Sequence, residues 1–464
     1  MSTTPPAFVH DLATCVGCHA CVVACGLENG TAPGGFWRQV VSFNEDRHPA
    51  LPVFHLSLAC NHCLDAPCER HCPALAIARD ARTGAVLIDA GRCIGCRYCS
   101  WVCPYDAPRF EPSSGVMGKC TLCHPRLLDG GQPACVTSCP TGALRLGPLD
   151  GDAPRGVPGF PDVGIRPAIR FLPLRGRRPD PAAEEKAVAA GAVAPGPWPV
   201  PPRKVSLRSE WTLVLFTFVV VALVAWLVAS LLGGLPVQTA PFVAAGGAGL
   251  ALSSLHLGRK ERAWRAALNW RRSWLSREVI AVPAFLALAA AHLLGPFPRA
   301  TGWLAAAAGV AALACMDHVY VVLARDRRPR LDAAAALLGA AFLAGVLAMV
   351  PWLVVATGLA RFAGFVERLR LRPEPRGAGA WALALVRVGL GLALPMTVAL
   401  TAGPTGLPLA AAAALAGELL DRVSFYDSLE VTTPRSRIAI AEAGQVQAGA
   451  AARAEAARRS DAAR

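Results

Sequence analysis

Cysteines at regular spacings are the residues of this chain best suited to chemistry. The clearest stretch runs Cys93-Ile-Gly-Cys96-Arg-Tyr-Cys99-Ser-Trp-Val-Cys103-Pro. This is the C-x2-C-x2-C-x3-C-P spacing that bacterial ferredoxins use for iron–sulfur clusters. Three thiolates on such a loop can hold three corners of a cubane, and the fourth serves a neighbouring cluster. The stretch therefore predicts electron-transfer chemistry.

Three related groups of four cysteines occur in the same part of the chain. They are Cys15, Cys18, Cys21 and Cys25; Cys60, Cys63, Cys68 and Cys72; and Cys120, Cys123, Cys135 and Cys139. With the first stretch they account for sixteen of the 17 cysteines, and the sixteen divide evenly into four groups of four, so four 4Fe–4S clusters are the simplest count. Structural zinc uses paired C-x2-C knuckles, whereas a C-x3-C step closes each group here. The spacing thus favours iron–sulfur clusters over zinc.

The elements that must position these cysteines belong to a chain of two contrasting parts. Residues 1–205 are polar and rich in proline and glycine, whereas residues 211–427 are Ala/Leu/Val runs separated by arginine-rich pieces. A length of 464 residues is too great for one domain. We expect a cluster domain over 1–178, a Pro/Ala-rich linker over 179–208, a membrane anchor over 209–430 and a basic Ala-rich tail over 431–464.

Seven apolar runs are long enough to cross a hydrocarbon core of about 30 Å. They cover residues 211–232, 237–257, 279–297, 301–324, 331–360, 378–400 and 405–427. The fifth is either one tilted helix or a hairpin near residues 345–351. A hairpin places the basic loops 259–277, 325–330 and 361–376 on one face with both termini, and leaves Arg299 alone opposite. The positive-inside rule therefore favours eight helices over seven, with the cluster domain in the cytoplasm.

The formal net charge of +14 does not indicate nucleic-acid binding. Its arginines cluster between apolar runs, which is where inner-membrane proteins keep them. The first thirty residues carry neither a twin-arginine run nor an apolar signal core. Cysteines in metal-type spacings and no signal together predict a reducing compartment rather than a disulfide framework.

The four cysteine groups resemble those of the iron–sulfur subunit of the dimethyl sulfoxide reductase family of molybdenum oxidoreductases. The fold class we expect is α+β ferredoxin-like, with two double-cluster ferredoxin units, followed by an all-α polytopic membrane bundle. The resemblance implies that the first group pairs with the fourth, and the second with the third. The implied ligand sets are Cys15, Cys18, Cys21 with Cys139; Cys120, Cys123, Cys135 with Cys25; Cys60, Cys63, Cys68 with Cys103; and Cys93, Cys96, Cys99 with Cys72. Cys96 stands where nitrate reductase relatives carry Trp, so it implies a four-iron cluster.

The apolar half resembles the membrane anchor subunit of the same family, usually a separate chain. The stretches that carry the resemblance are Ser-Leu-His256-Leu-Gly, Trp274-Leu-Ser-Arg-Glu278 and Gly417-Glu-Leu-Leu-Asp-Arg-Val-Ser-Phe-Tyr426. The resemblance implies that His256 and Glu278 line a menaquinol site, where an imidazole and a carboxylate can accept protons. Two structural alternatives remain: a satisfied interfacial histidine, and a glutamate in a first helical turn capped by Ser276.

Charged residues inside the apolar runs are costly in lipid and usually paired or functional. They are Asp317, Arg387, Glu418, Asp421 and Arg422. Glu418 and Arg422 stand at i,i+4, which predicts an internal ion pair. Haem is the rival cofactor, because His256 and His318 both lie nearer the basic face; the resemblance implies a haem-free anchor.

The sequence therefore predicts the electron-transfer and anchor component of a molybdenum oxidoreductase in the inner membrane. It would oxidise menaquinol from the membrane pool and pass electrons through four clusters to a separate molybdopterin-containing catalytic subunit. No P-loop, and no dinucleotide fingerprint following a strand, occurs in the chain. Two alternatives remain open: a quinone-reducing unit fed by a formate- or sulfur-oxidising partner, and a membrane-tethered redox sensor.

Overall fold

The protein is described by a computed structural model that covers most of the chain. The described residues are 5–31, 35–45, 51–150, 156–174, 205–321, 334–371, 378–427, 429, 431, 433–442 and 444–445. They form two compact units, a cluster unit before residue 204 and after 431, and a helical unit over Lys204–Val431 to which residues 73–75 are also assigned. Most of the predicted linker, the loops 325–330 and 372–376, and most of the predicted tail lie outside the described residues.

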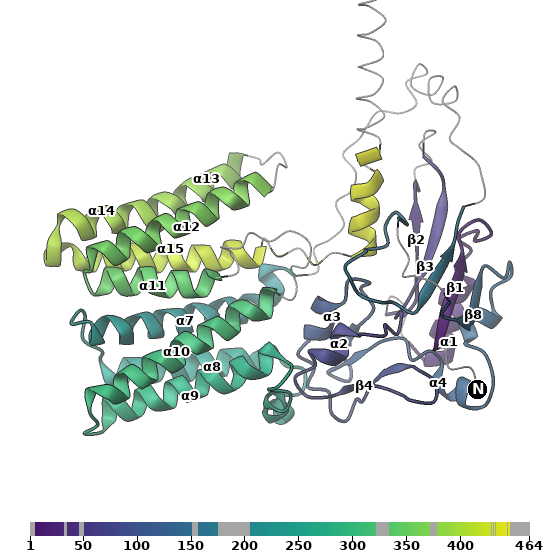
Figure 1. Ribbon diagram of the computed structural model, residues 1–464, viewed down its shortest axis with the longest axis horizontal. Helices are drawn as coiled ribbons and strands as arrows, with labels where there is room; N and C mark the ends of the chain where they lie inside the picture. The colour runs from purple at the N-terminus through teal and green to yellow at the C-terminus, as the bar shows by residue number, and fades with distance from the viewer. Residues whose placement is uncertain are drawn as a thin grey trace, which may run out of the picture. The chain divides into compact units, whose positions relative to one another are not determined.

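Short strands and short helices make up the cluster unit, which is ferredoxin-like (Figure 1). The strands are β1 (Pro6–Asp11), β2 (Gln39–Phe43), β3 (Phe54–Leu58), β4 (Ile77–Arg79), β5 (Val86–Ile88), β6 (Arg109–Glu111), β7 (Val116–Gly118), β8 (Leu144–Pro148) and β9 (Ile169–Leu172). The helices are α1 (Ala20–Asn29), α2 (Pro67–Arg70), α3 (Tyr98–Val102), α4 (His124–Leu128) and α5 (Ala134–Thr137).

Strand pairing ties distant parts of the cluster unit together. Strand β1 lies between β8, which is antiparallel, and β9, which is parallel, with Phe8 opposite both Leu146 and Ile169. The pairs β2–β3, β4–β5 and β6–β7 are antiparallel hairpins. Phe43 and Phe54, both buried, stack between β2 and β3 with ring centroids 4.8 Å apart. These sheets position the loops that carry the cysteines.

Residues after the last long helix return to the cluster unit. Residues 434–442 are helical. The buried carboxylate of Glu442 accepts a hydrogen bond from the backbone N–H of Asn44. A Cβ placed on Gly159 would meet Ile438 of this helix, so the two segments are in close contact. The described start of the predicted tail is therefore a packed element.

The helical unit contains a helix at each predicted apolar run. Its elements are α7 (Leu207–Leu231), α8 (Thr239–Leu255), η1 (Lys260–Ala267), α9 (Trp274–Leu294), α10 (Arg299–Val321), α11 (Ala335–Leu347), α12 (Pro351–Leu371), α13 (Ala378–Val388), η3 (Gly389–Ala393), α14 (Leu394–Thr401), η4 (Gly403–Gly406) and α15 (Leu407–Asp427). Among the described residues, four helices are long and apolar enough to cross a membrane, or five if α8 and η1 form one bent span. These helices indicate membrane association, and eight spans remain a prediction.

The fifth apolar run is broken into α11 and α12, which pack against each other. Met349 has φ 53°, and the N–H of Val350 donates to the carbonyl of Gly345 at 3.0 Å. At 13 residues, α11 is short for a span. Helix α12 includes Arg361, which the sequence analysis counted as a loop arginine.

Small residues let the helices approach closely, as is usual in membrane bundles. A Cβ on Gly391 would lie 2.6 Å from Gly417 Cα, so η3 and α15 are in backbone contact. The same test at Gly309 of α10 places a Cβ 3.0 Å from Phe285 of α9. Helix α10 packs against both α9 and α7, as can be followed in Figure 1.

Candidate iron–sulfur sites

The first step of every cysteine group folds in the same way. The residue before the second cysteine has a left-handed backbone; these residues are Gly17, His62, Gly95 and Leu122, with φ of 67°, 44°, 68° and 62°. The N–H of His62, Gly95 and Leu122 donates at 3.4 Å to the Sγ of Cys60, Cys93 and Cys120. Gly17 is the corresponding partner of Cys15. The shared turn aims a backbone donor at the first sulfur of each group.

The sequence predicts this turn at only two of the four positions, those with glycine. A left-handed conformation costs a residue other than glycine about 1–2 kcal/mol. Gly17 and Gly95 fit it, whereas His62 and Leu122 adopt it at that cost. At His62 the strand β5 compensates, because the N–H of Val86 donates to the ring Nδ1 at 2.9 Å. His62 is therefore a structural residue of its loop.

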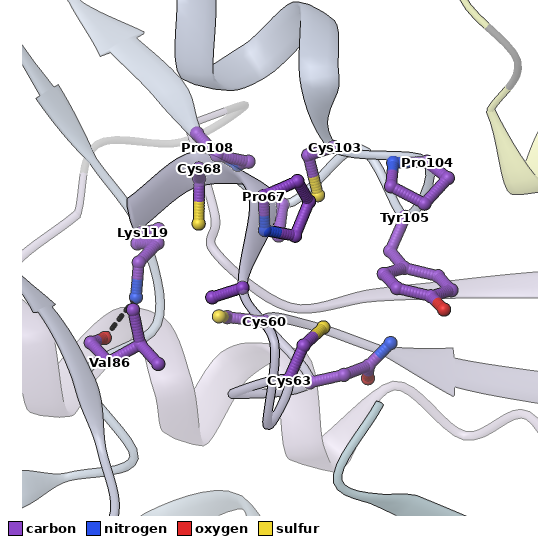
Figure 2. A pocket seen from close by; sticks show the side chains of 13 residues that line it. Cys60, Cys63, Pro67, Cys68, Val86, Cys103, Pro104, Tyr105, Pro108 and Lys119 are labelled. Atoms are coloured by element: carbon purple, nitrogen blue, oxygen red, sulfur yellow. Dashed lines mark hydrogen bonds between the residues drawn. The ribbon is translucent and has the colours of Figure 1, made fainter. Parts of the chain in front are cut away.

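Four thiols from two cysteine groups line one pocket of the cluster unit. Figure 2 shows Cys60, Cys63 and Cys68 together with Cys103 around this space. Pro67, Pro104 and Tyr105 close much of the rest with apolar surface. Burial, and next the thiols of Cys60, Cys103 and Cys68, raise the pKa of Cys63 well above its ordinary value. A group bound here would be shielded from water.

Other cysteines also have thiols as electrostatic neighbours. Burial, and next the thiol of Cys72, raises the pKa of Cys96 to about 12. Burial also raises the pKa of Cys25 to about 11; among the thiols, Cys135 and Cys123 raise it further. The neighbours of Cys15 are Cys21, Cys139 and Cys18. Those of Cys99 include Cys96, Cys68, Cys72 and Cys93, and those of Cys120 include Cys60, Cys135 and Cys25. These two thiols therefore also have neighbours outside the ligand sets that the resemblance implies.

The thiol sets fit a group larger than a single ion. Within the described part of the chain, no three His, Cys, Asp or Glu side chains lie close enough to share one metal ion. Zinc would draw four sulfurs to about 2.3 Å from one centre. A cubane instead takes its thiolates at separate corners. Buried thiols grouped around a space, with backbone donors aimed at their sulfurs, therefore suit a 4Fe–4S cluster.

Comparison with known proteins agrees with this chemistry. A family model described as a 4Fe-4S dicluster domain matches residues 51–149. One relative, a sulfite dehydrogenase subunit from Allochromatium vinosum, is 36% identical over an alignment of 205 positions that covers 38% of this chain and 85% of that relative. The chain belongs to the family of iron–sulfur subunits of molybdoenzyme complexes.

Two further members of the family are reductase subunits. One, from the anaerobic dimethyl sulfoxide reductase of Escherichia coli, is 38% identical over 156 residues, 32% of this chain and 76% of the relative. The other is an electron transfer subunit of the thiosulfate reductase of Salmonella typhi; it is 42% identical over 146 residues, 31% of this chain and 75% of the relative. As a family member, this chain is an iron–sulfur electron-transfer component of an oxidoreductase.

The thiol sets of this family member differ in their access to water. Cys18 is exposed, and Cys15 and Cys139 are half-buried. By contrast, the four thiols of the pocket in Figure 2 are all buried. The thiols of the first cysteine group are therefore more open to water than those of this pocket.

The helical unit places the two predicted quinol residues at neighbouring helix ends. His256 follows α8 as its C-cap and is half-buried. Glu278 lies in α9 and is 7% exposed. Helix α9 begins at Trp274, and its N-cap is Ser273, whose side chain accepts from the N–H of Ser276 at 3.3 Å. The alternative that Ser276 caps the helix and Glu278 stands in its first turn is therefore wrong.

A polar cluster that the sequence analysis did not assign lies near Glu278. The hydroxyls of Tyr320 in α10 and Tyr426 in α15 form a hydrogen bond, and both rings are buried. Glu278 is an electrostatic neighbour of both hydroxyls and of Asp317. Asp317 itself accepts from the N–H of Ala336 at 2.8 Å, which caps the start of α11. Only the packing of three helices brings these residues together.

The other buried charges form an ion network. Glu418 Oε1 pairs with Arg422 at 2.8 Å, which confirms the predicted i,i+4 pair, and Oε2 pairs with Arg361 at 2.8 Å. Asp421 pairs with Arg361 and Arg387. Because each charge has an opposite partner, a structural role accounts for this network.

His318, considered as a haem ligand, already has partners. Its Nδ1 donates to the carbonyl of Ala314 at 2.9 Å, one turn earlier in α10. Its ring stacks on Trp274 with centroids 4.3 Å apart. These contacts hold the ring against α9.

Proposed function

We propose that this chain carries electrons from menaquinol in the membrane to a separate molybdopterin-containing catalytic subunit through four 4Fe–4S clusters. The sixteen cysteines of the four groups would be the ligands. The observation that carries the proposal is the mixed origin of the thiol set in Figure 2, where Cys103 of the third group joins three thiols of the second. The same exchange is expected between the first and fourth groups.

The residues of the cluster unit would hold, orient and shield the clusters. When bound, a 4Fe–4S cluster accepts and releases one electron at a time. Backbone donors such as the N–H of Ala76, 3.3 Å from Cys72 Sγ, would stabilise charge on the sulfurs. Further donors to sulfur are Met117 N–H on Cys93 at 3.5 Å and Leu144 N–H on Cys139 at 3.4 Å.

The helical unit would supply the quinol site. Menaquinol loses two electrons and two protons when it is oxidised, so a site needs groups that take protons. His256 and Glu278 would be these groups, at the C-terminal end of α8 and in the N-terminal part of α9. We infer an arrangement of eight spans in the inner membrane with the cluster unit on the cytoplasmic side, because the 259–277 loop that contains η1 is rich in arginine.

A second direction of flow has support of its own. One relative, at 36% identity, is named as a subunit of a sulfite dehydrogenase. A dehydrogenase delivers electrons, so a chain of this type could instead receive them from a partner and reduce quinone. The same residues would serve, with His256 and Glu278 donating protons.

The test is made on the full chain, purified without oxygen and placed in lipid nanodiscs. The expected result is about sixteen irons per chain, with cluster signals in electron paramagnetic resonance that appear when a menaquinol analogue is added. Glu278→Gln and His256→Gln should abolish this reduction without loss of iron, whereas Glu261→Gln in η1 should not affect it. About four irons or fewer, or zinc in their place, would contradict the proposal. Faster oxidation of pre-reduced clusters by menaquinone would favour the second direction.

A further inference from the structure

Two cations are buried among the cysteine loops of the cluster unit. Arg38 is 1% exposed and Lys119 is 3% exposed. Arginine and lysine are almost never fully buried unless they are paired. Within the described residues, neither forms an ion pair with a carboxylate, and their hydrogen bonds go to neutral oxygens or to sulfur. The counter-charge they require must come from the thiolate sets.

Arg38 lies near thiols of both the first and the fourth groups. Its Nη1 donates to Ser57 Oγ at 2.9 Å, and that hydroxyl is 3.3 Å from Cys21 Sγ. Its Nε and Nη2 are buried with no hydrogen-bond partner among the described residues. The thiols nearest in electrostatic effect are Cys135, Cys120, Cys21 and Cys25. The guanidinium therefore keeps two buried donors without a partner, and its electrostatic neighbours are thiols of both the first and the fourth groups.

Lys119 lies near thiols of the second and fourth groups. Its Nζ lines the pocket of Cys60 and Cys68 and donates to the carbonyl of Val86, as Figure 2 shows. It is also 3.3 Å from the carbonyl of Cys120, the next residue in the chain. The ammonium is thus an electrostatic neighbour of Cys60 and Cys68 in the second group and of Cys120 in the fourth.

We propose that the fixed positive charges of Arg38 and Lys119 raise the reduction potentials of the clusters next to them. This inference rests on the four clusters of the proposed function. Uptake of an electron adds one negative charge to a cluster and removes one from the neighbour that gives it, with no proton or bond exchanged. In a medium of low dielectric, a fixed cation favours the more negative state. Cations near two sets would therefore ease reduction of both neighbours.

The test is a potentiometric titration of Arg38→Gln and Lys119→Met in the full chain, followed by electron paramagnetic resonance. Each signal is assigned by its loss in the matching cysteine-to-serine variant. We expect the equilibrium constant for reducing each adjacent cluster to fall at least tenfold, which is 59 mV for one electron. The reduction potential of the cluster held by Cys93, Cys96 and Cys99 should not change in Arg38→Gln. Arg38→Lys should restore most of the potential.

Arg126 provides a matched control. It is a cation near Cys123, and its exposed side chain forms an ion pair with Glu28 at 2.7 Å. Arg126→Gln should change the reduction equilibrium less than twofold, because solvent and Glu28 already screen its charge.

Three outcomes would overturn the inference. The first is unchanged potentials in fully loaded Arg38→Gln and Lys119→Met. The second is an equal shift in Arg126→Gln. The third is loss of iron in both neutral variants, since the cations would then serve assembly; if only one variant loses iron, the other decides. A low iron count in the unaltered chain would contradict the proposed function itself, so the two failures are distinguishable.

Discussion

The two units of this protein bury charge by opposite means. In the cluster unit, Arg38 and Lys119 face thiols, which need a bound group before they become a stable set of negative charges. In the helical unit, Arg361 lies between two carboxylates, those of Glu418 and Asp421, which the chain itself supplies. The first unit is therefore electrostatically incomplete without a cofactor, whereas the second is balanced by its own side chains.

The same contrast appears in the length of the elements. Apart from α1 and the C-terminal segment 434–442, no helix in the described part of the cluster unit exceeds five residues, whereas α7 in the helical unit has 25. Short elements bury little apolar surface, so metal binding must supply much of the folding free energy. Close packing of small residues and apolar helices stabilises the other unit. Four predictions test this difference.

Removal of a single thiol should have the largest effect. Cys68→Ser takes one ligand from the pocket in Figure 2, and we expect loss of about four irons per chain, with a lower unfolding temperature of the cluster unit. Iron analysis and a thermal scan measure both. Cys315→Ser in α10 is the control and should retain all iron. Full iron in Cys68→Ser would mean that this thiol is no ligand.

Disruption of the ion network should destabilise the helical unit without affecting iron. Glu418→Gln leaves Arg361 and Arg422 short of a partner, and breaking a buried pair costs about 3–5 kcal/mol. Unfolding in detergent, followed by circular dichroism, measures the loss. Glu261→Gln, on the exposed side of η1, should change stability little. An equally small effect for Glu418→Gln would show that water reaches the network.

A smaller loss of stability is expected from two glycine substitutions that compare backbone strain with side-chain packing. Gly17 and Gly30 have φ of 67° and 60°, but a Cβ on Gly17 would lie 2.8 Å from His55, and one on Gly30 would meet nothing within 4 Å. Gly30→Ala should cost about 1 kcal/mol and Gly17→Ala about 2–3 kcal/mol, measured by chemical unfolding. Equal losses would mean that the His55 ring moves aside.

The smallest effect concerns the returning C-terminal helix. Glu442→Ala removes the acceptor of the Asn44 N–H, at an expected cost of about 1–2 kcal/mol. Faster proteolysis after residue 431 would report release of the helix. Ile440→Ala on the same helix is a control, because Ile440 is 64% exposed. Identical cleavage of all forms would argue against a stable contact.

The sequence alone determined the chemistry of the first unit and the position of the helices in the second. Cysteine spacing is local, because three thiols of one loop must grip one cluster, and this spacing also led to the family. Apolar runs are local too, so each one is helical, although the fifth is broken into α11 and α12. The i,i+4 pair of Glu418 and Arg422 could be predicted for the same reason.

Only the tertiary structure decided what occupies the spaces between these elements. Arg38 and Lys119 carry no sequence signal, since their role depends on loops that lie far apart in the chain. The hydroxyl pair of Tyr320 and Tyr426 depends in the same way on packing of α10 against α15. Arg361 belongs to an ion network rather than to a loop because α12 continues past it. Electrostatic effects and packing depend on distances through space, which residue spacing does not encode.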